Sequence, residues 1–330
     1  MFYKKKLKIK LLYILLMLRR TLELNKYSRN KTAPVEAEKE RHEEYQYLNL
    51  ISDILAEGVM EYGRNGNAKS VTGSVMHFSL EGGVFPLLTT KKVAWKTCAK
   101  ELFWFISGST DNKILQDQKV TIWNGNASRE YLDDIGLYDR AENDLGPVYG
   151  HQWRHFNAPY TTCKADYQDK GIDQLDYIIS CLKNQHSRNS RRLVMSAWNP
   201  CQMGEMALPP CHVLVQFNVS GGDKLSCSLY QRSGDVGLGV PFNIASYSLL
   251  THIIAKHCGL IATDFYYHLG NCHIYDDHLE SLAEQVTRVP YTFPTLKINS
   301  VHGSIEDYSL DDIEIFNYNT HEKINMVMRT

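Results

Sequence analysis

The chain has 330 residues, of which 43% are hydrophobic and 22% are charged. This composition is ordinary for a globular protein and excludes wholesale disorder or collagen-like repeats, and the length predicts about two domains or one large α/β domain. No apolar run approaches the ~20 residues that a membrane-spanning helix needs, so the sequence argues against an integral membrane protein.

The net charge is −1, but basic residues gather at the N-terminus, where residues 1–31 hold seven Lys and three Arg against one acidic residue, Glu23. The remainder is mildly acidic, which argues against a nucleic-acid-binding core. The eight cysteines are scattered and form no C-x-x-C pair. The sequence therefore indicates neither a metal site nor a disulfide scaffold, and we expect a reducing compartment.

Residues 1–44 are expected to form a basic and polar N-terminal extension that is disordered or weakly helical. The apolar stretch Leu11–Leu18 is similar to the core of a signal peptide, but it is short and no small-residue cleavage site follows it. An organellar transit peptide is an open alternative, because acidic residues are few. We expect a cytoplasmic protein, with a nuclear or organellar location left open by this extension.

The folded domain is expected to span residues 45–330. Apolar residues at helical spacing predict helices over 45–59, 93–106, 172–182 and 243–258. Strand-like runs cover 75–80, 193–198, 213–219, 224–231, 265–269 and 295–299. Residues 63–73 are polar and predict a loop, and residues 125–146 are polar and predict a surface insertion. Because helices and strands interleave without a regular βαβ alternation, we expect an α+β fold with one sheet packed against helices.

Residues 207–212 read Ala-Leu-Pro-Pro-Cys-His, which places a thiol directly after two prolines. Proline restricts the backbone at and before its own position, and a rigid backbone suits a nucleophile that must be aimed. A thiol with a pKa of about 8.5 is mostly protonated at neutral pH, so Cys211 needs a nearby cation to act as a nucleophile. The alternative is a buried structural cysteine.

Other polar residues suggest a phosphate site. Arg232 and Ser233 supply a guanidinium fork and a hydroxyl, which together suit a phosphate. Arg191 and Arg192 precede a strand-like run, where they either clamp a phosphate or are solvated edge charges.

Three further segments hold candidate site residues. Glu101 lies in an apolar helix, where a carboxyl should have a raised pKa that suits proton transfer, unless it forms a buried ion pair. The Asn243 amide can both donate and accept a hydrogen bond, or it can be a simple helix N-cap. His273 and Tyr275 either bind sugar hydroxyls or end a strand.

Six motifs, in order along residues 45–330, together resemble the thymidylate synthase family: FPLLTTKK (85–92), ELFWFISGST (101–110), DLGPVYGHQWRHF (144–156), RRLVMSAWNP (191–200), LPPCH (208–212) and QRSGDVGLGVPFNIASY (231–247). The resemblance implies an α+β, thymidylate synthase-like fold, with a mixed β-sheet packed with helices and a sheet-mediated homodimer. It implies a methyltransferase of dTMP biosynthesis and one-carbon metabolism, which methylates dUMP with 5,10-methylenetetrahydrofolate as carbon donor and reductant.

The resemblance also assigns roles to single residues. Cys211 matches the nucleophile that attacks uracil C6, Glu101 matches the carboxylate that moves protons, and the catalytic set further includes Tyr149, His212, Asn243 and Arg232. The dUMP contacts that it implies are Arg64, Arg191, Arg192, Gln231, Arg232, Ser233, Asp235, Asn243, His273 and Tyr275. The folate contacts are Trp123, Asp235, Gly239, Phe242 and Met328. Arg191 and Arg192 would reach the phosphate of the partner subunit.

The sequence departs from the family pattern at three places within this domain. The phosphate loop, residues 63–69, reads Gly-Arg-Asn-Gly-Asn-Ala-Lys, and Arg64 lies one residue closer to Gly73 than is usual. Asn271 replaces an acidic residue two positions before His273. The chain ends in Met328-Arg329-Thr330, in place of the small or apolar residues that the resemblance leads one to expect over the folate.

Three alternatives follow from the same residues. A dUMP or dCMP hydroxymethylase of the same superfamily would add water where a synthase transfers hydride, but a cytosine site favours a carboxylate at position 243. A non-catalytic binding or regulatory homologue would use its basic tail on RNA or on a membrane surface, and binding to its own mRNA stays open. A Cys–His hydrolase would use Cys211 with His212, yet adjacent side chains on extended backbone point apart.

Overall fold

The fold is that of a computed structural model, in which residues 42–63 and 65–329 are described. Most of the expected N-terminal extension, residues 1–41, lies outside the described residues, as do Arg64 and Thr330. Of the expected extension the structure describes residues 42–44, and Glu44 is fully buried. No helix among the described residues is long and apolar enough to cross a membrane.

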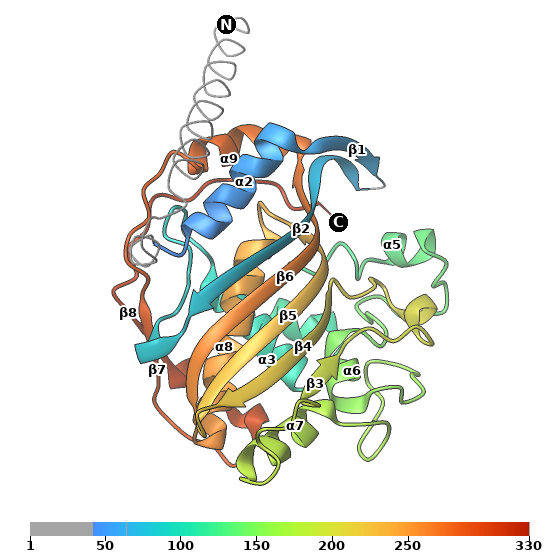
Figure 1. The fold of residues 1–330 in the computed structure, drawn as a ribbon. Helices are drawn as coiled ribbons and strands as arrows, with labels where there is room; N and C mark the ends of the chain where they lie inside the picture. Colours follow the sequence, from blue (N-terminus) through green and yellow to red (C-terminus); the bar gives the residue numbers. More distant parts are fainter. Residues whose placement is uncertain (1–41, 64, 330) are drawn as a thin grey trace, which may run out of the picture.

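A twisted sheet of six strands forms the centre of the molecule, in the order β1-β2-β6-β5-β4-β3 (Figure 1). The strands are β1 (Val59–Gly63), β2 (Gly66–Ser79), β3 (Val194–Ser196), β4 (His212–Ser220), β5 (Lys224–Asp235) and β6 (Ile261–Tyr275). Neighbouring strands are antiparallel except β5 and β6, which are parallel. The sheet is therefore mixed, as expected. A second, two-stranded sheet pairs β7 (Thr295–Ile298) with β8 (Ile313–Phe316), where one sheet was expected.

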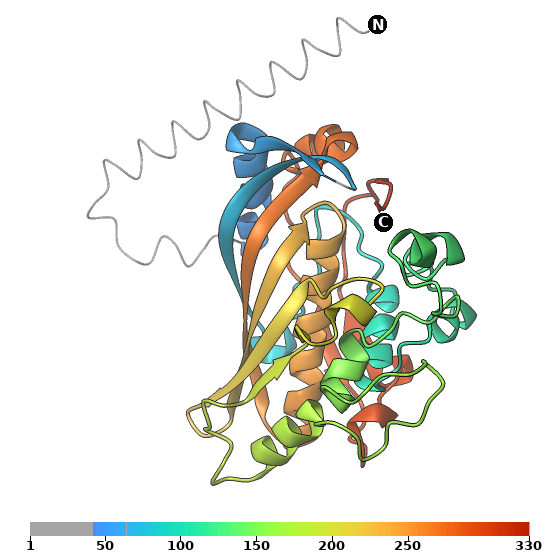
Figure 2. The same cartoon turned by 90° about the vertical axis from the view of Figure 1, so that its right-hand side faces the viewer.

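Helices cover one face of the sheet and leave most of the other face open (Figure 2). The helices are α2 (Tyr45–Glu57), α3 (Trp95–Ile106), α4 (Asn112–Asp117), α5 (Arg129–Asp134), α6 (Tyr149–His155), α7 (Gln174–Lys183), α8 (Gly239–Cys258) and α9 (Leu279–Gln285). Helix α8 packs against β5, β6 and α3, and nearly all of its residues are buried. The α+β expectation is thus confirmed.

Three segments differ from the sequence-based expectation. The helix expected over 45–59 ends at Glu57, and Val59 begins β1. The polar loop expected over 63–73 instead contains the first half of β2, because β2 pairs with β1 and, along nearly its whole length, with β6. Helix α8 begins at Gly239, four residues before the expected start, with Pro241 in its first turn, where proline is tolerated. Asn243 therefore lies inside the helix and is not its N-cap.

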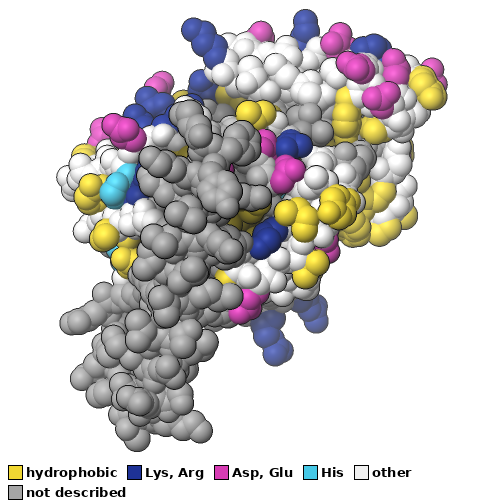
Figure 3. Space-filling view, turned by 90° about the horizontal axis from the view of Figure 1, so that it is seen from above, with side chains coloured by type: hydrophobic (Ala, Val, Ile, Leu, Met, Phe, Trp, Pro, Cys, Tyr) yellow, Lys and Arg dark blue, Asp and Glu magenta, His cyan; other side chains and the backbone are white. Residues whose placement is uncertain are grey.

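The open face of the sheet carries apolar side chains. Val75 on β2, Tyr230 on β5 and Leu214 on β4 are 61%, 43% and 36% exposed and lie in one row across the strands, with His268 of β6 between Val75 and Tyr230. Exposed apolar patches on a sheet are typical of interaction surfaces. On the coloured part of the surface seen in Figure 3, hydrophobic, acidic and basic side chains are interspersed.

Candidate active site

Cys211 lies at the residue before β4, and its backbone is held on both sides. Its N–H donates to the Tyr149 hydroxyl oxygen at 2.7 Å, and its carbonyl accepts the N–H of Arg232 on β5 at 2.9 Å. The two preceding prolines have no N–H to donate, so the hydrogen bonds at the backbone of Cys211 are what hold this segment to α6 and β5. The thiol therefore has a defined position between α6 and β5.

The Arg232 guanidinium is folded against this proline segment. Its Nε donates to the carbonyl of Pro210 at 2.8 Å and its Nη2 to that of Pro209 at 2.7 Å, and it lies 5.7 Å from the centre of the Trp198 ring. Burial raises the pKa of the Cys211 thiol above its ordinary value, while the Arg232 guanidinium lowers it. The cation that the sequence analysis required is thus beside the thiol.

A chain of polar side chains runs from His212 to β5. Asn243 Nδ2 donates to His212 Nε2 at 2.6 Å, and the Tyr267 hydroxyl donates to Gln231 Oε1 at 2.6 Å while lying 3.4 Å from Asn243 Oδ1. Burial lowers the pKa of His212 to about 4, so the imidazole is neutral and a weak base. This environment, with His212 bonded to Asn243, disfavours the Cys–His hydrolase alternative.

Glu101 projects from α3 toward the indole of Trp123, and it forms no ion pair with any residue that the structure describes. Its Oε1 accepts the N–H of Trp123 at 2.8 Å. Burial raises the pKa of this carboxyl to about 7, and the indole hydrogen bond opposes the shift. A carboxyl that titrates near neutral pH can both give and take a proton. Among the described residues, the partner of this carboxyl is thus the indole N–H of Trp123 and not the cation of a buried ion pair.

Tyr149, at the start of α6, connects the Glu101–Trp123 pair with His212 through aromatic contacts. Its ring centre lies 6.0 Å from that of Trp123 and 5.0 Å from that of His212. Its hydroxyl holds the Cys211 amide. The structure thus brings Cys211, Arg232, His212, Asn243, Tyr149, Trp123 and Glu101 into one connected site.

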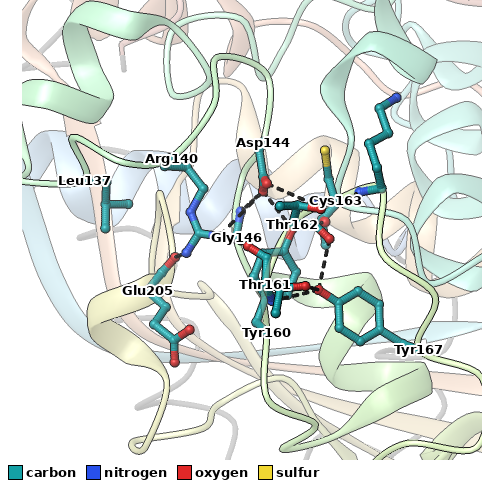
Figure 4. A network of polar contacts seen from close by, with 12 residues as sticks. Leu137, Arg140, Asp144, Gly146, Tyr160, Thr161, Thr162, Cys163, Tyr167 and Glu205 are labelled. Atoms are coloured by element: carbon teal, nitrogen blue, oxygen red, sulfur yellow. Dashed lines mark hydrogen bonds and ion pairs between the residues drawn. The ribbon is translucent and has the colours of Figure 1, made fainter.

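The segment before Tyr149 is fixed by the buried carboxylate of Asp144, which the sequence analysis did not single out (Figure 4). Asp144 Oδ1 accepts the Tyr160 hydroxyl at 2.6 Å and the N–H of Gly146 at 2.9 Å, and Oδ2 accepts the N–H of Cys163 at 2.9 Å. The carbonyl of Leu145, the residue between Asp144 and Gly146, accepts the N–H of Ala207 at 2.9 Å. This network connects the polar insertion to the segment that leads to Cys211.

His273 and Tyr275 lie on β6 beside the end of β5, where His273 pairs with Asp235 and Asn271 with Ser233. Asn271 Oδ1 lies 2.9 Å from His273 Nδ1, so the amide oxygen takes the place of the carboxylate that the family pattern leads one to expect. Burial lowers the pKa of His273. The departure at position 271 therefore keeps a hydrogen bond to the imidazole.

The C-terminal segment lies against the end of β6. The carbonyl of Val327 is bonded to His278 Nε2 at 2.8 Å, and Arg329 Nη2 lies 3.0 Å from a carboxylate oxygen of both Asp276 and Asp277. The Arg329 guanidinium is also 5.5 Å from the Tyr275 ring centre. The unusual Arg329 thus ties the segment down beside a predicted sugar contact.

Other expected site residues are placed less centrally. Gly239 is the first residue of α8, and Phe242 lies on the same helix. Met328 is 44% exposed. Arg191 and Arg192 are exposed, just before the edge strand β3. Among the described residues no cluster of His, Cys, Asp or Glu could hold a metal ion.

Tyr267, which bridges Gln231 and Asn243, is a site residue that the sequence pattern did not predict. The alternation of apolar residues over 265–269 marks it as an inward-facing strand residue, but pattern alone does not show that its hydroxyl meets two amides.

The family model for thymidylate synthase matches residues 45–330. The chain therefore belongs to the thymidylate synthase family, as its motifs predicted. It is 53% identical over 290 residues to a bifunctional dihydrofolate reductase-thymidylate synthase of Paramecium tetraurelia, an alignment that covers 88% of this chain and 62% of that protein.

Plant proteins are similarly close. A putative bifunctional dihydrofolate reductase-thymidylate synthase of Oryza sativa subsp. japonica is 53% identical, covering 88% of this chain and 58% of the relative. The protein of Arabidopsis thaliana called bifunctional dihydrofolate reductase-thymidylate synthase 2 is 52% identical, covering 88% and 51%. The chain thus spans between half and two thirds of the length of these relatives.

Proposed function

We propose that the protein is a thymidylate synthase, which converts dUMP to dTMP with 5,10-methylenetetrahydrofolate and releases dihydrofolate. Residues 45–330 form its catalytic domain. The observation that carries the proposal is the environment of Cys211, whose thiol lies in a rigid segment beside the Arg232 guanidinium. The family membership and the names of the bifunctional relatives support the same reaction.

The thiol is chemically required because C5 of uracil is a poor nucleophile. Addition of the Cys211 thiolate to C6 converts C5 into the carbon of an enolate, which can attack an electrophilic one-carbon unit. Loss of the C5 proton and expulsion of the thiolate at the end restore both the uracil ring and Cys211. The co-substrate supplies the carbon and the hydride.

We assign the nucleotide contacts by their chemistry. Arg232 and Ser233 suit the phosphate, with Arg64 and Gln231 beside them, and His273 and Tyr275 suit the ribose 3′-hydroxyl. Asn243 suits the N3–H and O4 edge of uracil. Its amide is already bonded to the neutral His212 and lies near Tyr267, so it meets the base in one orientation.

Glu101 suits the proton steps at the pyrimidine. Its carboxyl, with a pKa of about 7, is partly protonated and partly ionised at neutral pH, so it can serve in both directions. Tyr149 holds the segment of the nucleophile and packs between Trp123 and His212.

The residues assigned to the folate fit an aromatic ligand with N–H donors. Among the described residues, the hydrogen bonds to Asp235 all reach Oδ1, which leaves Oδ2 for such a donor. Trp123 and Phe242 offer aromatic surface, and Gly239 permits close approach of the backbone. Met328 lies in the segment that His278 and Arg329 hold.

A homodimer is supported by the open face of the sheet. Val75, Tyr230 and Leu214 form an exposed apolar row there, and Arg191 and Arg192 are free to reach another chain from the adjacent edge strand. We propose that two copies pack through this face and exchange these arginines. We place the protein in the cytoplasm, since its eight cysteines are free thiols.

The test is to incubate the purified protein with dUMP and 5,10-methylenetetrahydrofolate and to measure dihydrofolate absorbance and the nucleotide product together. The proposal predicts dihydrofolate and dTMP in equal amounts. Hydroxymethyl-dUMP without dihydrofolate would identify a hydroxymethylase, and the absence of any product would contradict the enzymatic proposal.

A further inference from the structure

We propose that Tyr47 and Glu44 are positioning residues for the turn of residues 235–238, called here the 235–238 turn, which carries the carboxylate assigned to the folate. The inference rests on the proposed function and deepens it. Neither residue belongs to the motifs from which the site was predicted. Tyr47 lies in the first turn of α2, and Glu44 lies in the part of the chain expected to be an extension.

Tyr47 acts on the 235–238 turn directly. Its side chain is fully buried, and its hydroxyl donates to the carbonyl of Val236 at 2.8 Å. On the opposite side of the same peptides, Asp235 Oδ1 accepts the N–H of Gly237 at 2.8 Å and that of Leu238 at 3.3 Å. The carboxylate and the turn are therefore one unit, and a shift of Val236 re-aims Asp235.

Glu44 acts on the turn through one intermediate segment. Glu44 Oε2 accepts two hydrogen bonds from Thr89, from the N–H at 2.9 Å and from the hydroxyl at 2.6 Å. Glu44 Oε1 accepts the corresponding two from Thr90, from the N–H at 2.8 Å and from the hydroxyl at 2.6 Å. The next residue, Lys91, donates from its ammonium group to the carbonyl of Gly237. The buried carboxylate thus fixes the residues that aim Lys91.

The 235–238 turn depends on these contacts because it lies between two regular elements. Strand β5 ends at Asp235 and helix α8 begins at Gly239. The carbonyls of Val236 and Gly237 are held from the side of Tyr47 and Lys91. On a further side a Cβ added at Gly237 would lie 2.9 Å from His278 Nδ1 and 3.2 Å from Met326 Sδ, so little space is left there.

The consequence is selective for one substrate. Asp235, which begins the turn, is assigned to both substrates, and Gly239, which directly follows the turn, is assigned to the folate alone. Cys211 and Arg232 are held by a separate set of bonds around Pro209 and Pro210. Loosening the turn should therefore weaken folate binding more than dUMP binding. A role limited to overall stability would not separate the two substrates.

The first experiment uses Tyr47→Phe, which removes the hydroxyl and keeps the ring. Loss of one buried hydrogen bond should raise KM for methylenetetrahydrofolate about 3- to 10-fold. KM for dUMP and kcat should change less than about twofold, because the bonds around Cys211 are untouched. In the protein without substrates, amide hydrogen exchange at Gly237 and Leu238 should accelerate.

The matched control is Tyr308→Phe. Tyr308 is also a buried tyrosine, and its hydroxyl lies 3.4 Å from His257 Nδ1, away from the turn. This variant should lose stability without changing either KM or the exchange of residues 237–238.

A second pair of variants tests the carboxylate. Glu44→Gln places an NH2 group against N–H and O–H donors, so it should reproduce the folate KM increase and the faster exchange. Glu43→Gln, a neighbouring carboxylate that accepts the N–H of Ser79 at 2.9 Å, should change neither. Likewise, removal of residues 1–40 should leave activity intact, whereas removal of residues 1–44 should raise the folate KM.

Two results would overturn the inference: unchanged folate KM and unchanged exchange at 237–238 in both Tyr47→Phe and Glu44→Gln, or equal losses in these variants and in their controls. The exchange measurement needs no activity. Faster exchange in a protein that makes no dTMP would therefore support the positioning role while contradicting the proposed function.

Discussion

At the scale of single residues, burial sets the charge state of the groups around Cys211. The same loss of water lowers the pKa of His212 to about 4 and raises that of Glu101 to about 7. One group is therefore held neutral as a hydrogen-bonding partner, while the other titrates near neutral pH. This division fits a site that needs a fixed amide at the base edge and a mobile proton beside it.

Glu101 also makes stability depend on pH. Its pKa is about 7 in the folded protein and ordinarily 4.5, so between these values the folded state binds a proton that the unfolded state lacks. The free energy of unfolding should fall as pH rises through this window. Glu101→Gln removes the effect, and its stability relative to the native protein should increase by up to ~3 kcal/mol between pH 5 and pH 8.

Urea denaturation of both proteins at the two pH values measures this difference. The lowered pKa of His212 has the opposite effect on stability, but it is present in both proteins and cancels. A constant difference between the two proteins at pH 5 and pH 8 would show that Glu101 does not titrate as proposed.

Asn243 is expected to decide which pyrimidine is accepted. Cytosine lacks a proton at N3 and carries a donor at N4, so an acceptor-only carboxylate suits it better than an amide. Asn243→Asp should shift the ratio of kcat/KM for dCMP over dUMP by at least ~10-fold toward dCMP. Asn243→Ala is the control, since it should weaken both substrates without favouring dCMP. An unchanged ratio in the aspartate variant would refute this reading of the uracil edge.

At the scale of elements, the sequence predicted those helices and strands that the spacing of apolar residues along the chain determines. Helices over 93–106 and 172–182 and the strand over 213–219 follow from their apolar spacing, and the structure has α3, α7 and β4 there. The β1–β2 hairpin escaped prediction because Gly66 and its polar neighbours signal a loop, whereas pairing with the distant β6 makes a strand.

In the site, too, residues within motifs could be predicted, whereas residues that depend on distant partners could not. Cys211, Arg232 and Asn243 could be named because long motifs surround them. Asp144 belongs to one of those motifs, but its role depends on Tyr160 and Cys163, which it meets through the folded insertion. Glu44 and Tyr47 meet their partners across the molecule, so no spacing in the sequence indicates their role.

At the scale of the whole molecule, the proposed dimer makes a prediction about mixtures. If Arg191 and Arg192 serve the partner's site, a Cys211→Ala chain paired with an Arg191→Ala/Arg192→Ala chain contains one complete site. Refolding an equal mixture of the two inactive variants should therefore restore about a quarter of the native activity. Each variant refolded alone is the control. No recovery in a mixture that forms dimers would show that these arginines do not act across the interface.

The central claim for the whole molecule is that the rigidly held Cys211 thiol makes C5 of dUMP nucleophilic. The most direct test supplies dUMP tritiated at C5, together with methylenetetrahydrofolate, and compares the native protein with Cys211→Ala. The account predicts that the native protein releases one tritium to water for each dihydrofolate formed, while the variant folds but loses activity by ~1000-fold or more. Tritium release at the native rate by Cys211→Ala would contradict it.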